Sequence, residues 1–274
     1  MNLRKHLLAA QQKLAQFPSA RLDAEILMAH ALDSPRSFLY ANPELDLPLR
    51  HSNSFKKLIR RRSRGEPIAY ITGVREFWSL TLRITPDVLI PRHETELLVE
   101  VALQRIPPSE LQKIADLGTG SGAIALAIAS ERPGCSIHAT DLSKAAISLA
   151  EENANRLGTK VQFHHGSWCE PLSGQFEMIV SNPPYIGAND PHLKQGDVRF
   201  EPALALSPGT DALSEFRVIA EQASERLTNR GWLILEHGTD QASDVRDILA
   251  SHEFTKIETM KDLAGHERVT LCCK

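Results

Sequence analysis

The sequence has few cysteines, and they lack the spacing that marks a disulfide framework. Only 4 cysteines occur among 274 residues, and two of them, Cys272 and Cys273, are adjacent and cannot easily bridge each other. The apolar run at residues 7–10 is too short for a signal sequence. We therefore expect reduced thiols and a cytoplasmic location.

Long apolar stretches and metal-binding motifs are missing as well. No stretch of about 18 apolar residues occurs, so the sequence predicts no membrane span and no membrane partner. His164 and His165 are neighbours on an expected strand, where successive side chains point to opposite faces. We interpret both as structural histidines and expect no bound metal.

The net charge is small, but the charges are unevenly distributed. The formal net charge is −3, yet residues 1–80 hold 13 Lys/Arg against 7 Asp/Glu, and the remaining residues hold 18 against 27. A basic N-terminal part and an acidic remainder of the chain suggest two surfaces with different partners. The total is not that of a dedicated nucleic-acid binder, so no stable nucleic-acid binding is expected.

Residues 1–72 are expected to form a small helical domain. Apolar residues recur there at helical spacing, and no glycine-rich loop or catalytic group of residues is present. The last long helix of this region, at about residues 52–64, ends at Gly65. Its basic cluster is explained equally well by a solvated helix face and by a docking patch for an acidic partner or RNA. This cluster consists of Arg60, Arg61, Arg62 and Arg64.

Residues 73–95 are expected to form a β-hairpin that links two domains. Apolar residues alternate up to Ile84 and resume at residues 88–90, with Pro86 and Asp87 between the two runs. A helix is expected to follow, with Glu94 or Thr95 near its cap.

Residues 96–274 alternate between strand-like and helix-like segments. This alternation predicts an α/β fold with a doubly wound, mostly parallel sheet. The last two strands have no room for a crossover helix between them, so an antiparallel hairpin is expected at the edge. The strand-like runs lie at residues 113–117, 136–140, 161–165, 176–181, 232–236, 255–259 and 268–272.

A glycine-rich segment closes the first of these strands and opens a helix. Glycines allow a ligand to approach the backbone, and the helix N-terminus behind them offers free N–H groups and positive potential. Asp141 ends the next strand, about twenty residues on, where a carboxylate can bind both hydroxyls of a ribose. These features predict a site for an adenosine-containing ligand. The segment reads Asp116-Leu117-Gly118-Thr119-Gly120-Ser121-Gly122.

Two kinds of adenosine ligand are compatible with this loop. Gly118, Gly120 and Ala123 satisfy the spacing of a dinucleotide site, which keeps a nicotinamide enzyme open as an alternative. Asp116 places a negative charge by the loop, which favours a cationic ligand with an ammonium and a sulfonium over a pyrophosphate. Trp168 follows a later strand; stacking on an adenine and ordinary core packing explain it about equally well.

The segment Asn182-Pro183-Pro184-Tyr185 ends another expected buried strand. Its two prolines stop the strand, because neither can donate to a ladder, and they stiffen the backbone. The Asn182 side-chain oxygen and the Pro183 carbonyl provide two acceptors, which suit a guest with an NH2 group. Tyr185 adds a flat face that can clamp a planar group. We interpret this segment as the reactive half of the site rather than as a plain turn.

These motifs resemble those of class I S-adenosylmethionine-dependent methyltransferases that act on an amide or exocyclic amino nitrogen. Six further segments resemble the bacterial release-factor glutamine methyltransferases, the HemK/PrmC family, and the resemblance covers nearly the whole chain. Two departures, His93 for proline and Ala212 for glycine, lie outside the cofactor and acceptor motifs. The six segments are Arg75-Glu76-Phe77-Trp78, Leu89-Ile90-Pro91-Arg92, Gly166-Ser167-Trp168, Glu201-Pro202, Leu235-Glu236-His237-Gly238 and Asp262-Leu263-Ala264-Gly265.

The resemblance implies a Rossmann-like seven-stranded methyltransferase domain joined to an N-terminal helical bundle that docks the substrate. It implies methylation of the N5 amide nitrogen of the glutamine in the Gly-Gly-Gln motif of class I peptide chain release factors, which supports translation termination. The residues implied to contact S-adenosylmethionine are Gly118, Thr119, Gly120, Ser121, Gly122, Asp141, Trp168 and Asn182. Those implied to hold the glutamine are Asn182, Pro183, Pro184 and Tyr185, with Asn182, Pro183 and Tyr185 catalytic.

Three other functions remain open from the residues alone. An adenine-N6 or cytosine-N4 nucleic-acid methyltransferase would use residues 182–185 on a flipped base; the basic cluster favours it and the acidic catalytic half disfavours it. An NAD-dependent dehydrogenase is supported only by the glycine spacing and Asp141. A non-catalytic adaptor conflicts with the intact 182–185 segment. No general base is identifiable from the sequence, and water is the expected acceptor of the proton.

Overall fold

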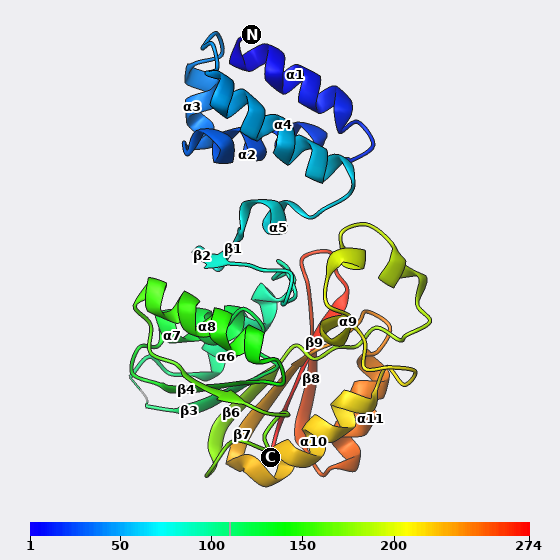
Figure 1. The fold of residues 1–274 in the computed structure, drawn as a ribbon. Helices are drawn as coiled ribbons and strands as arrows, with labels where there is room; N and C mark the ends of the chain where they lie inside the picture. The colour runs from blue at the N-terminus through cyan, green and yellow to red at the C-terminus, as the bar shows by residue number, and fades with distance from the viewer. Residues whose placement is uncertain (110) are drawn as a thin grey trace. The chain divides into compact units, whose positions relative to one another are not determined.

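The computed structural model of the chain describes residues 1–109 and 111–274. They divide into two compact units, Met1–Val74 and Arg75–Lys274, each with its own apolar core (Figure 1). Within the described residues, no helix is both long enough and apolar enough to cross a membrane.

The first unit is the helical bundle that the sequence predicts. Leu27, Met28 and Phe55 are buried in its core. Pro48 and Pro67 each stand directly before a helix, where a missing N–H leaves no helical hydrogen bond unmade. The helices are α1 (Leu3–Lys13), α2 (Ala20–Leu32), α3 (Arg36–Ala41), α4 (Leu49–Ser63) and α5 (Ile68–Thr72).

The prediction of a four-arginine surface cluster is wrong for Arg62. This residue follows Phe55 and Ile59 at helical spacing, so it falls on the buried face of α4. Its Nε lies 2.7 Å from Asp23 Oδ2, and both side chains are 7% exposed or less. Its guanidinium also stacks on the Phe17 ring, 4.1 Å from the centroid. Arg62 therefore holds the bundle together and is not available to a partner.

The predicted hairpin is present, but it is shorter than expected, and all of it except Val74 belongs to the second unit. β1 (Val74–Phe77) and β2 (Leu80–Arg83) are joined by Trp78 and Ser79, which both have positive φ, at 51° and 60°. Such a two-residue turn matches the twist of the strands and closes the hairpin early. Val88 donates its N–H back to the Thr85 carbonyl in a separate turn, so residues 88–90 add no strand.

The second unit contains the expected seven-stranded, mostly parallel sheet. Its strand order is β5-β4-β3-β6-β7-β9-β8, with β9 antiparallel to both of its neighbours, which confirms the terminal antiparallel hairpin. β7 begins five residues earlier than predicted, since Leu227 already pairs with Phe176 before a bulge in the register. The strands are β3 (Lys113–Leu117), β4 (Ser136–Asp141), β5 (Gln162–His165), β6 (Phe176–Ser181), β7 (Leu227–Glu236), β8 (Thr255–Lys261) and β9 (Glu267–Cys273).

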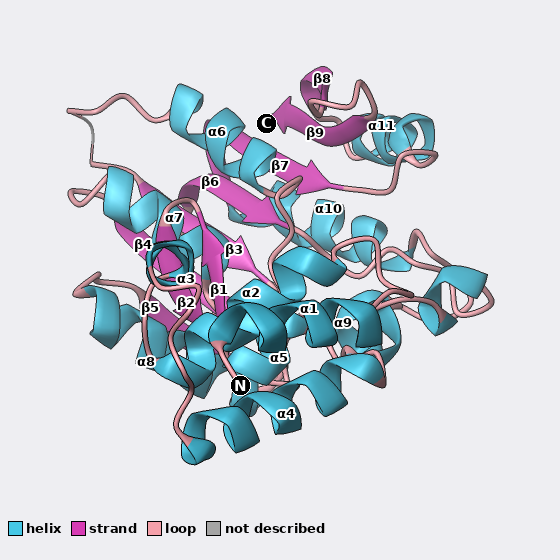
Figure 2. Cartoon of the chain, turned by 90° about the horizontal axis from the view of Figure 1, so that it is seen from above, coloured by secondary structure: helices cyan, strands magenta, loops and turns pink. Residues whose placement is uncertain are grey.

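Helices cover both faces of this sheet. The group α6, α7 and α8 lies on one face, and α10 and α11 lie on the other (Figures 1 and 2). Phe216, Ile219, Val245 and Leu249 of the second group are buried in the core against the strands. The helical elements are α6 (Glu96–Arg105), α7 (Ala123–Glu131), α8 (Lys144–Leu157), η1 (Pro191–Lys194), η2 (Val198–Phe200), α9 (Ala203–Leu206), α10 (Ser214–Arg226) and α11 (Ala242–Ser251).

Candidate active site

Four strand ends meet at one edge of the sheet and bring the expected site residues together. Leu117 of β3 pairs with Thr140 of β4 on one side and with Ser181 of β6 on the other. Ser181 in turn pairs with Leu235 of β7. This is the carboxyl edge of the parallel strands, where open α/β sheets bind ligands. The residues that follow on these strands are Gly118, Asp141, Asn182 and Glu236.

The glycine loop requires its glycines for backbone conformation and for space. Gly118, Gly120 and Gly122 have φ of 72°, 58° and 85°, in the left-handed region that side chains disfavour. A Cβ at Gly118 would also lie 3.1 Å from the Trp168 ring, whereas a Cβ at Gly120 would meet nothing within 4 Å. The loop thus packs tightly at its start and leaves room for a ligand at Gly120.

Asp141 braces the glycine loop from the neighbouring strand. Its Oδ2 accepts a hydrogen bond from Gly120 N at 2.8 Å, and its Oδ1 accepts one from Ser143 N at 2.8 Å. Burial raises the pKa of this carboxyl, and the two backbone donors oppose that rise. Each oxygen keeps a further lone pair. The side chain is therefore suited to the predicted ribose contact as well as to the bracing, which sequence reasoning missed.

Asp116 is buried within the same loop and ties it to α7. Its side chain accepts hydrogen bonds from Thr119 Oγ1 at 2.6 Å and from Ala125 N at 3.2 Å. Burial raises the pKa of Asp116 to about 7. The negative charge that the sequence suggests beside the loop is therefore only partly present near neutral pH. Its Oδ1 has no hydrogen-bond partner among the described residues.

Trp168 lies against the start of the glycine loop. The edge of its ring lies where a Cβ at residue 118 would meet it, and its Nε1 donates to Glu215 Oε2 at 2.8 Å. The rest of the side chain packs on the apolar core of the sheet. Trp168 therefore packs in the core and also lies beside the loop. Its stacking on an adenine stays a prediction.

Asn182 is oriented by a residue that is distant in the sequence. Its Nδ2 donates to Thr95 Oγ1 at 3.2 Å, which leaves the side-chain oxygen as the acceptor that the sequence predicts. Directly before it, Ser181 Oγ donates to the Leu117 carbonyl at 2.8 Å and ties β6 to β3. Pro183 follows, and its side chain is buried.

Tyr185 is held from both its side chain and its backbone. The hydroxyl donates to Glu236 Oε1 at 3.4 Å, and the carbonyl accepts from Gln241 Nε2 at 3.0 Å. Burial raises the pKa of Tyr185 above its ordinary value, so the phenol stays protonated. Tyr185 is thus a fixed packing surface and hydrogen-bond donor, which suits the predicted clamp.

Glu236 and Thr95 are site residues that sequence reasoning missed. Glu236 is 1% exposed, and burial raises its pKa to about 7, against the lowering effect of the Thr95 hydroxyl and Arg268. Its Oε2 has no hydrogen-bond partner in the part of the chain that the structure describes. The available signal was the position of Glu236 at the end of an expected strand, as for Asp141. Thr95 was expected only near a helix cap, and it does occupy that place before α6.

An ion pair with a buried carboxylate fixes the segment that leads into Thr95. Arg92 Nη2 pairs with Glu201 Oε1, and the side chain of Glu201 is fully buried. Glu201 Oε2 also accepts a hydrogen bond from Ile90 N at 3.2 Å. Two residues that entered the sequence analysis only as parts of motifs therefore anchor this side of the site.

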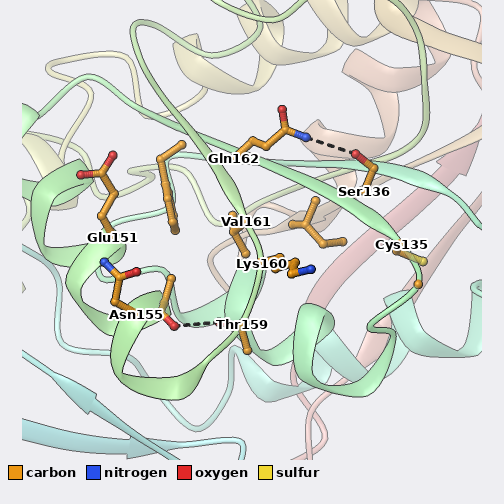
Figure 3. Close-up of a pocket in the computed structure, with 12 residues that line it drawn as sticks. Cys135, Ser136, Glu151, Asn155, Thr159, Lys160, Val161 and Gln162 are labelled. Atoms are coloured by element: carbon orange, nitrogen blue, oxygen red, sulfur yellow. Dashed lines mark hydrogen bonds between the residues drawn. The ribbon is translucent and has the colours of Figure 1, made fainter.

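The cavity drawn in Figure 3 lies at the other end of the strands. It has a volume of about 630 Å³ and is bordered by Cys135 and Ser136, at the start of β4, and by Glu151, Lys160 and Gln162. Asp141 closes β4 at its opposite end. None of the predicted site residues lines this cavity, so it is separate from the candidate active site.

The fold of the chain resembles that of known methyltransferases over about three quarters of its length. A methyltransferase from Pyrococcus furiosus is 16% identical, with a TM-score of 0.54 over 78% of this chain and 95% of that chain. A T. thermophilus 16S rRNA methyltransferase, solved with AdoMet and guanosine, is 19% identical, with a TM-score of 0.55 over 73% of this chain and 49% of that chain. At these identities the likeness concerns the fold alone.

Sequence comparison is more specific than the fold. The PrmC N-terminal domain matches residues 6–73, and the Methyltransferase small domain matches residues 93–198. Proteins named release factor glutamine methyltransferase are 49% identical in Aliivibrio fischeri, over 92% of this chain and 90% of the relative, and 49% identical in Pseudomonas aeruginosa, over 96% of each. The Escherichia coli relative of that name is 46% identical over 99% of this chain and 98% of its own length. With these matches along nearly its whole length, the chain belongs to the release factor glutamine methyltransferase family.

Proposed function

We propose that this protein transfers a methyl group from S-adenosylmethionine to N5 of the glutamine in the Gly-Gly-Gln motif of class I peptide chain release factors. Family membership supports the reaction and the substrate. The observation that carries the proposal is the Asn182 amide, whose nitrogen is engaged by Thr95 and whose oxygen is thereby left to accept from a substrate N–H. None of the four cysteines, which all lie among the described residues, forms a disulfide, and this suits a cytoplasmic protein.

The carboxyl edge of the sheet fits S-adenosylmethionine, which supplies the methyl group when bound. The open space at Gly120 lets this ligand approach the backbone of the loop. The free lone pairs of Asp141 can accept hydrogen bonds from its ribose hydroxyls. Trp168, held by Glu215, offers a ring for the adenine. The proposed cofactor-binding set is the one that the resemblance implies. It comprises Gly118, Thr119, Gly120, Ser121, Gly122, Asp141, Trp168 and Asn182.

The chain's own contribution to the reaction is orientation and electrostatic stabilisation. An amide nitrogen is a poor nucleophile because its lone pair is delocalised into the carbonyl. The Asn182 oxygen and the Pro183 carbonyl would accept its two N–H groups and favour positive charge on the nitrogen as the new bond forms. Pro184 and Tyr185 would hold the plane of the amide. Orientation of this kind gains on the order of 7–11 kcal/mol in well-placed reactions.

The first unit is proposed to dock the release factor, since a single glutamine side chain offers little to recognise. α4 contains no acidic residue, and its outer face is basic. Such a stripe attracts an acidic surface and speeds its encounter. Arg62 is excluded from it for the reason given above. The exposed basic residues along this helix and its end are Arg50, Lys56, Lys57, Arg60, Arg61 and Arg64.

Methylation of purified release factor tests the reaction directly. The full-length protein, labelled S-adenosylmethionine and release factor are incubated, and the Gly-Gly-Gln peptide is examined by mass spectrometry. One added methyl group on the glutamine is expected, and the Asn182→Ala variant is expected to add it at least a hundredfold more slowly. A parallel incubation with DNA and RNA tests the nucleic-acid alternative. Incorporation into nucleic acid, or none into release factor, would contradict the proposal.

Charge reversal tests the docking surface. Arg60→Glu combined with Arg64→Glu is expected to lower kcat/KM for release factor three- to tenfold, because exposed charges act on encounter and are worth about 1 kcal/mol. Lys5→Glu combined with Lys13→Glu, at two exposed positions of α1, is the matched control for an equal change of charge elsewhere in the unit. Unchanged kcat/KM at low salt would remove α4 from the docking surface.

A further inference from the structure

Tyr185 follows two prolines and is held to the rest of the fold by few backbone hydrogen bonds. Neither Pro183 nor Pro184 has an N–H to donate, so the segment cannot continue the ladder of β6. Among the described residues, the Tyr185 carbonyl is the only backbone group of residues 183–185 that takes part in a hydrogen bond. The position of this proposed clamp therefore depends on the partner of that carbonyl.

The partner is Gln241, in the turn between β7 and α11. Gln241 Nε2 donates to the Tyr185 carbonyl at 3.0 Å, which is close to the most favourable distance for an N–H···O bond. The Tyr185 hydroxyl lies 3.4 Å from Glu236 Oε1, beyond the usual range of an O–H···O bond. The Gln241 contact is therefore the stronger of the two hydrogen bonds that hold Tyr185.

The direction of the Gln241 amide is fixed by backbone groups at both of its ends. Its Oε1 accepts from Gly238 N at 2.9 Å, and a backbone N–H can only donate. Its Nε2 meets a carbonyl, which can only accept. A flipped amide would bring two donors together at one end and two acceptors together at the other. Only one orientation of Gln241 is therefore compatible with both partners.

Gly238 leaves the space that this side chain needs. A Cβ at Gly238 would lie 2.9 Å from Gln241 Oε1, which is too short for a non-bonded contact, so the amide would have to move. The φ of Gly238 is not positive, so the backbone itself would accept a side chain. The missing side chain at Gly238, the last residue of the 235–238 motif, therefore serves the approach of Gln241.

The turn that carries Gln241 is anchored to β9. His237 N donates to the Arg268 carbonyl at 2.9 Å. The His237 ring has Nδ1 2.8 Å from the Gly238 carbonyl and Nε2 2.9 Å from Thr270 Oγ1. A carbonyl can only accept, so Nδ1 carries the proton, and in the neutral ring Nε2 accepts from the Thr270 hydroxyl. Gln241 therefore extends from a turn with anchors of its own.

We infer that Gln241 is a positioning residue of the methyl transfer, which holds Tyr185 against the substrate amide through its backbone carbonyl, and that Gly238 provides the room for it. The inference rests on the proposed function and specifies how the clamp on the amide is kept in place. Gln241 acts through Tyr185 and need not touch the substrate. Its hydrogen bonds within the described chain do not reach the glycine loop, so cofactor affinity should not depend on it.

Substitutions at Gln241 separate the two ends of its amide. Gln241→Met keeps the length and removes both hydrogen bonds, whereas Gln241→Glu keeps the acceptor for Gly238 and turns a second oxygen toward a carbonyl. Gln241→Met is expected to lower kcat for release factor about fivefold, the factor that one net hydrogen bond is worth, and Gln241→Glu to lower it further. KM and the affinity for S-adenosylhomocysteine should stay within about twofold, because docking and cofactor contacts are unchanged. Wild-type kcat in either variant would overturn the inference.

Gly238→Ala tests the same bridge without changing Gln241. Gly134→Ala is the matched control, because a Cβ there would likewise lie 2.9 Å from a side-chain atom, of Leu111, at the opposite end of the strands. Gly238→Ala is expected to lower kcat as Gln241→Met does, and Gly134→Ala to leave it unchanged. Combining Gly238→Ala with Gln241→Met should add no further loss, because both remove one bridge. Losses that multiply in the double variant would overturn the link between the two residues.

An isotope label at the backbone carbonyl carbon of tyrosine gives an NMR readout that needs no turnover. The chain has 3 tyrosines, and the Tyr185 signal is assigned by its loss in Tyr185→Phe. Loss of the hydrogen bond should move this signal upfield in Gln241→Met and in Gly238→Ala, but not in Gly134→Ala. An unchanged signal in Gln241→Met would overturn the inference. If the signal moves as expected but wild type does not methylate release factor, the proposed function fails while the bridge stands.

Discussion

The two halves of the proposed active site are braced by hydrogen bonds that span very different distances along the sequence. In the glycine loop, Asp116 bonds to residues three and nine positions later, and Asp141 bonds to Gly120 across 21 positions. In the reactive segment, Asn182 bonds to Thr95 across 87 positions. The hydrogen bonds that hold the glycine loop therefore join residues close in sequence, whereas the bond that orients Asn182 depends on how separate elements pack together.

This difference predicts different responses to substitution. A change in the glycine loop alters ligand affinity and local stability together, because the same carboxylates serve both. A change in the reactive segment should mainly alter the rate, because its residues are proposed to orient the substrate, and only Asn182 among them is also proposed to contact the cofactor. Four substitutions or pairs of substitutions test this separation, in order of decreasing effect.

Asn182→Ala should have the largest effect, and it should fall on the rate. Removing one transition-state hydrogen bond of this kind costs about 2.7–4 kcal/mol, which is roughly a hundredfold to a thousandfold in kcat. Binding of S-adenosylhomocysteine, measured by calorimetry, should weaken much less. A variant that keeps more than a tenth of wild-type kcat would contradict the role given to Asn182.

Asp141→Ala should mainly lower the affinity for the cofactor. The lost charge-assisted bonds are worth roughly 1.5–3 kcal/mol, and the Gly120 and Ser143 N–H groups lose their acceptor as well. S-adenosylhomocysteine affinity is therefore expected to fall at least tenfold, and the melting temperature should fall with it. Asp141→Asn, which keeps an acceptor oxygen, is the control. Unchanged affinity in the alanine variant would remove Asp141 from the site.

The range of the contacts also explains what the sequence could predict. The glycine loop was predictable because its parts, including Asp141, stand at fixed short spacings after consecutive strands. Asn182 and Tyr185 were predictable as residues at a strand end, and the strand order then places them beside the loop. Nearly all of the sheet followed from the alternation of apolar runs, for the same local reasons.

What could not be predicted depends on packing between distant segments. No spacing rule pairs Thr95 with Asn182 or Tyr185 with Glu236. The burial of Arg62 has the same origin, because its partners Asp23 and Phe17 lie in other parts of the bundle. The hairpin turn at Trp78 was missed because a tryptophan at positive φ contradicts its local preference.

Gly118→Ala tests the contact between the loop and Trp168. Gly158, which ends α8, has a similar φ of 67° but a Cβ there would meet nothing within 4 Å, so Gly158→Ala is the matched control for strain alone. Both variants are expected to lose about 1–2 kcal/mol of unfolding free energy from the left-handed backbone. Only Gly118→Ala should also lose S-adenosylhomocysteine affinity, by three- to tenfold. Equal affinity in both would show that the Trp168 contact does not shape the cofactor site.

The smallest effect concerns the pH dependence of stability, where the two halves should behave alike. Burial raises the pKa of Asp116 in one half and of Glu236 in the other to about 7, from ordinary values near 4. Between those values the folded protein holds protons that the unfolded chain has released. The stabilising contribution of each carboxyl is therefore complete below about pH 4 and is lost as the pH rises through about 7.

Asp116→Asn removes the titrating carboxyl from the cofactor half of the site, and Glu236→Gln removes it from the reactive half. Each should flatten the fall in unfolding free energy between pH 5 and pH 8, because the amide that replaces the carboxyl does not titrate. Denaturant unfolding at several pH values measures the difference from wild type. Parallel pH profiles for wild type and both variants would mean that these carboxyls titrate at their ordinary values in the folded protein.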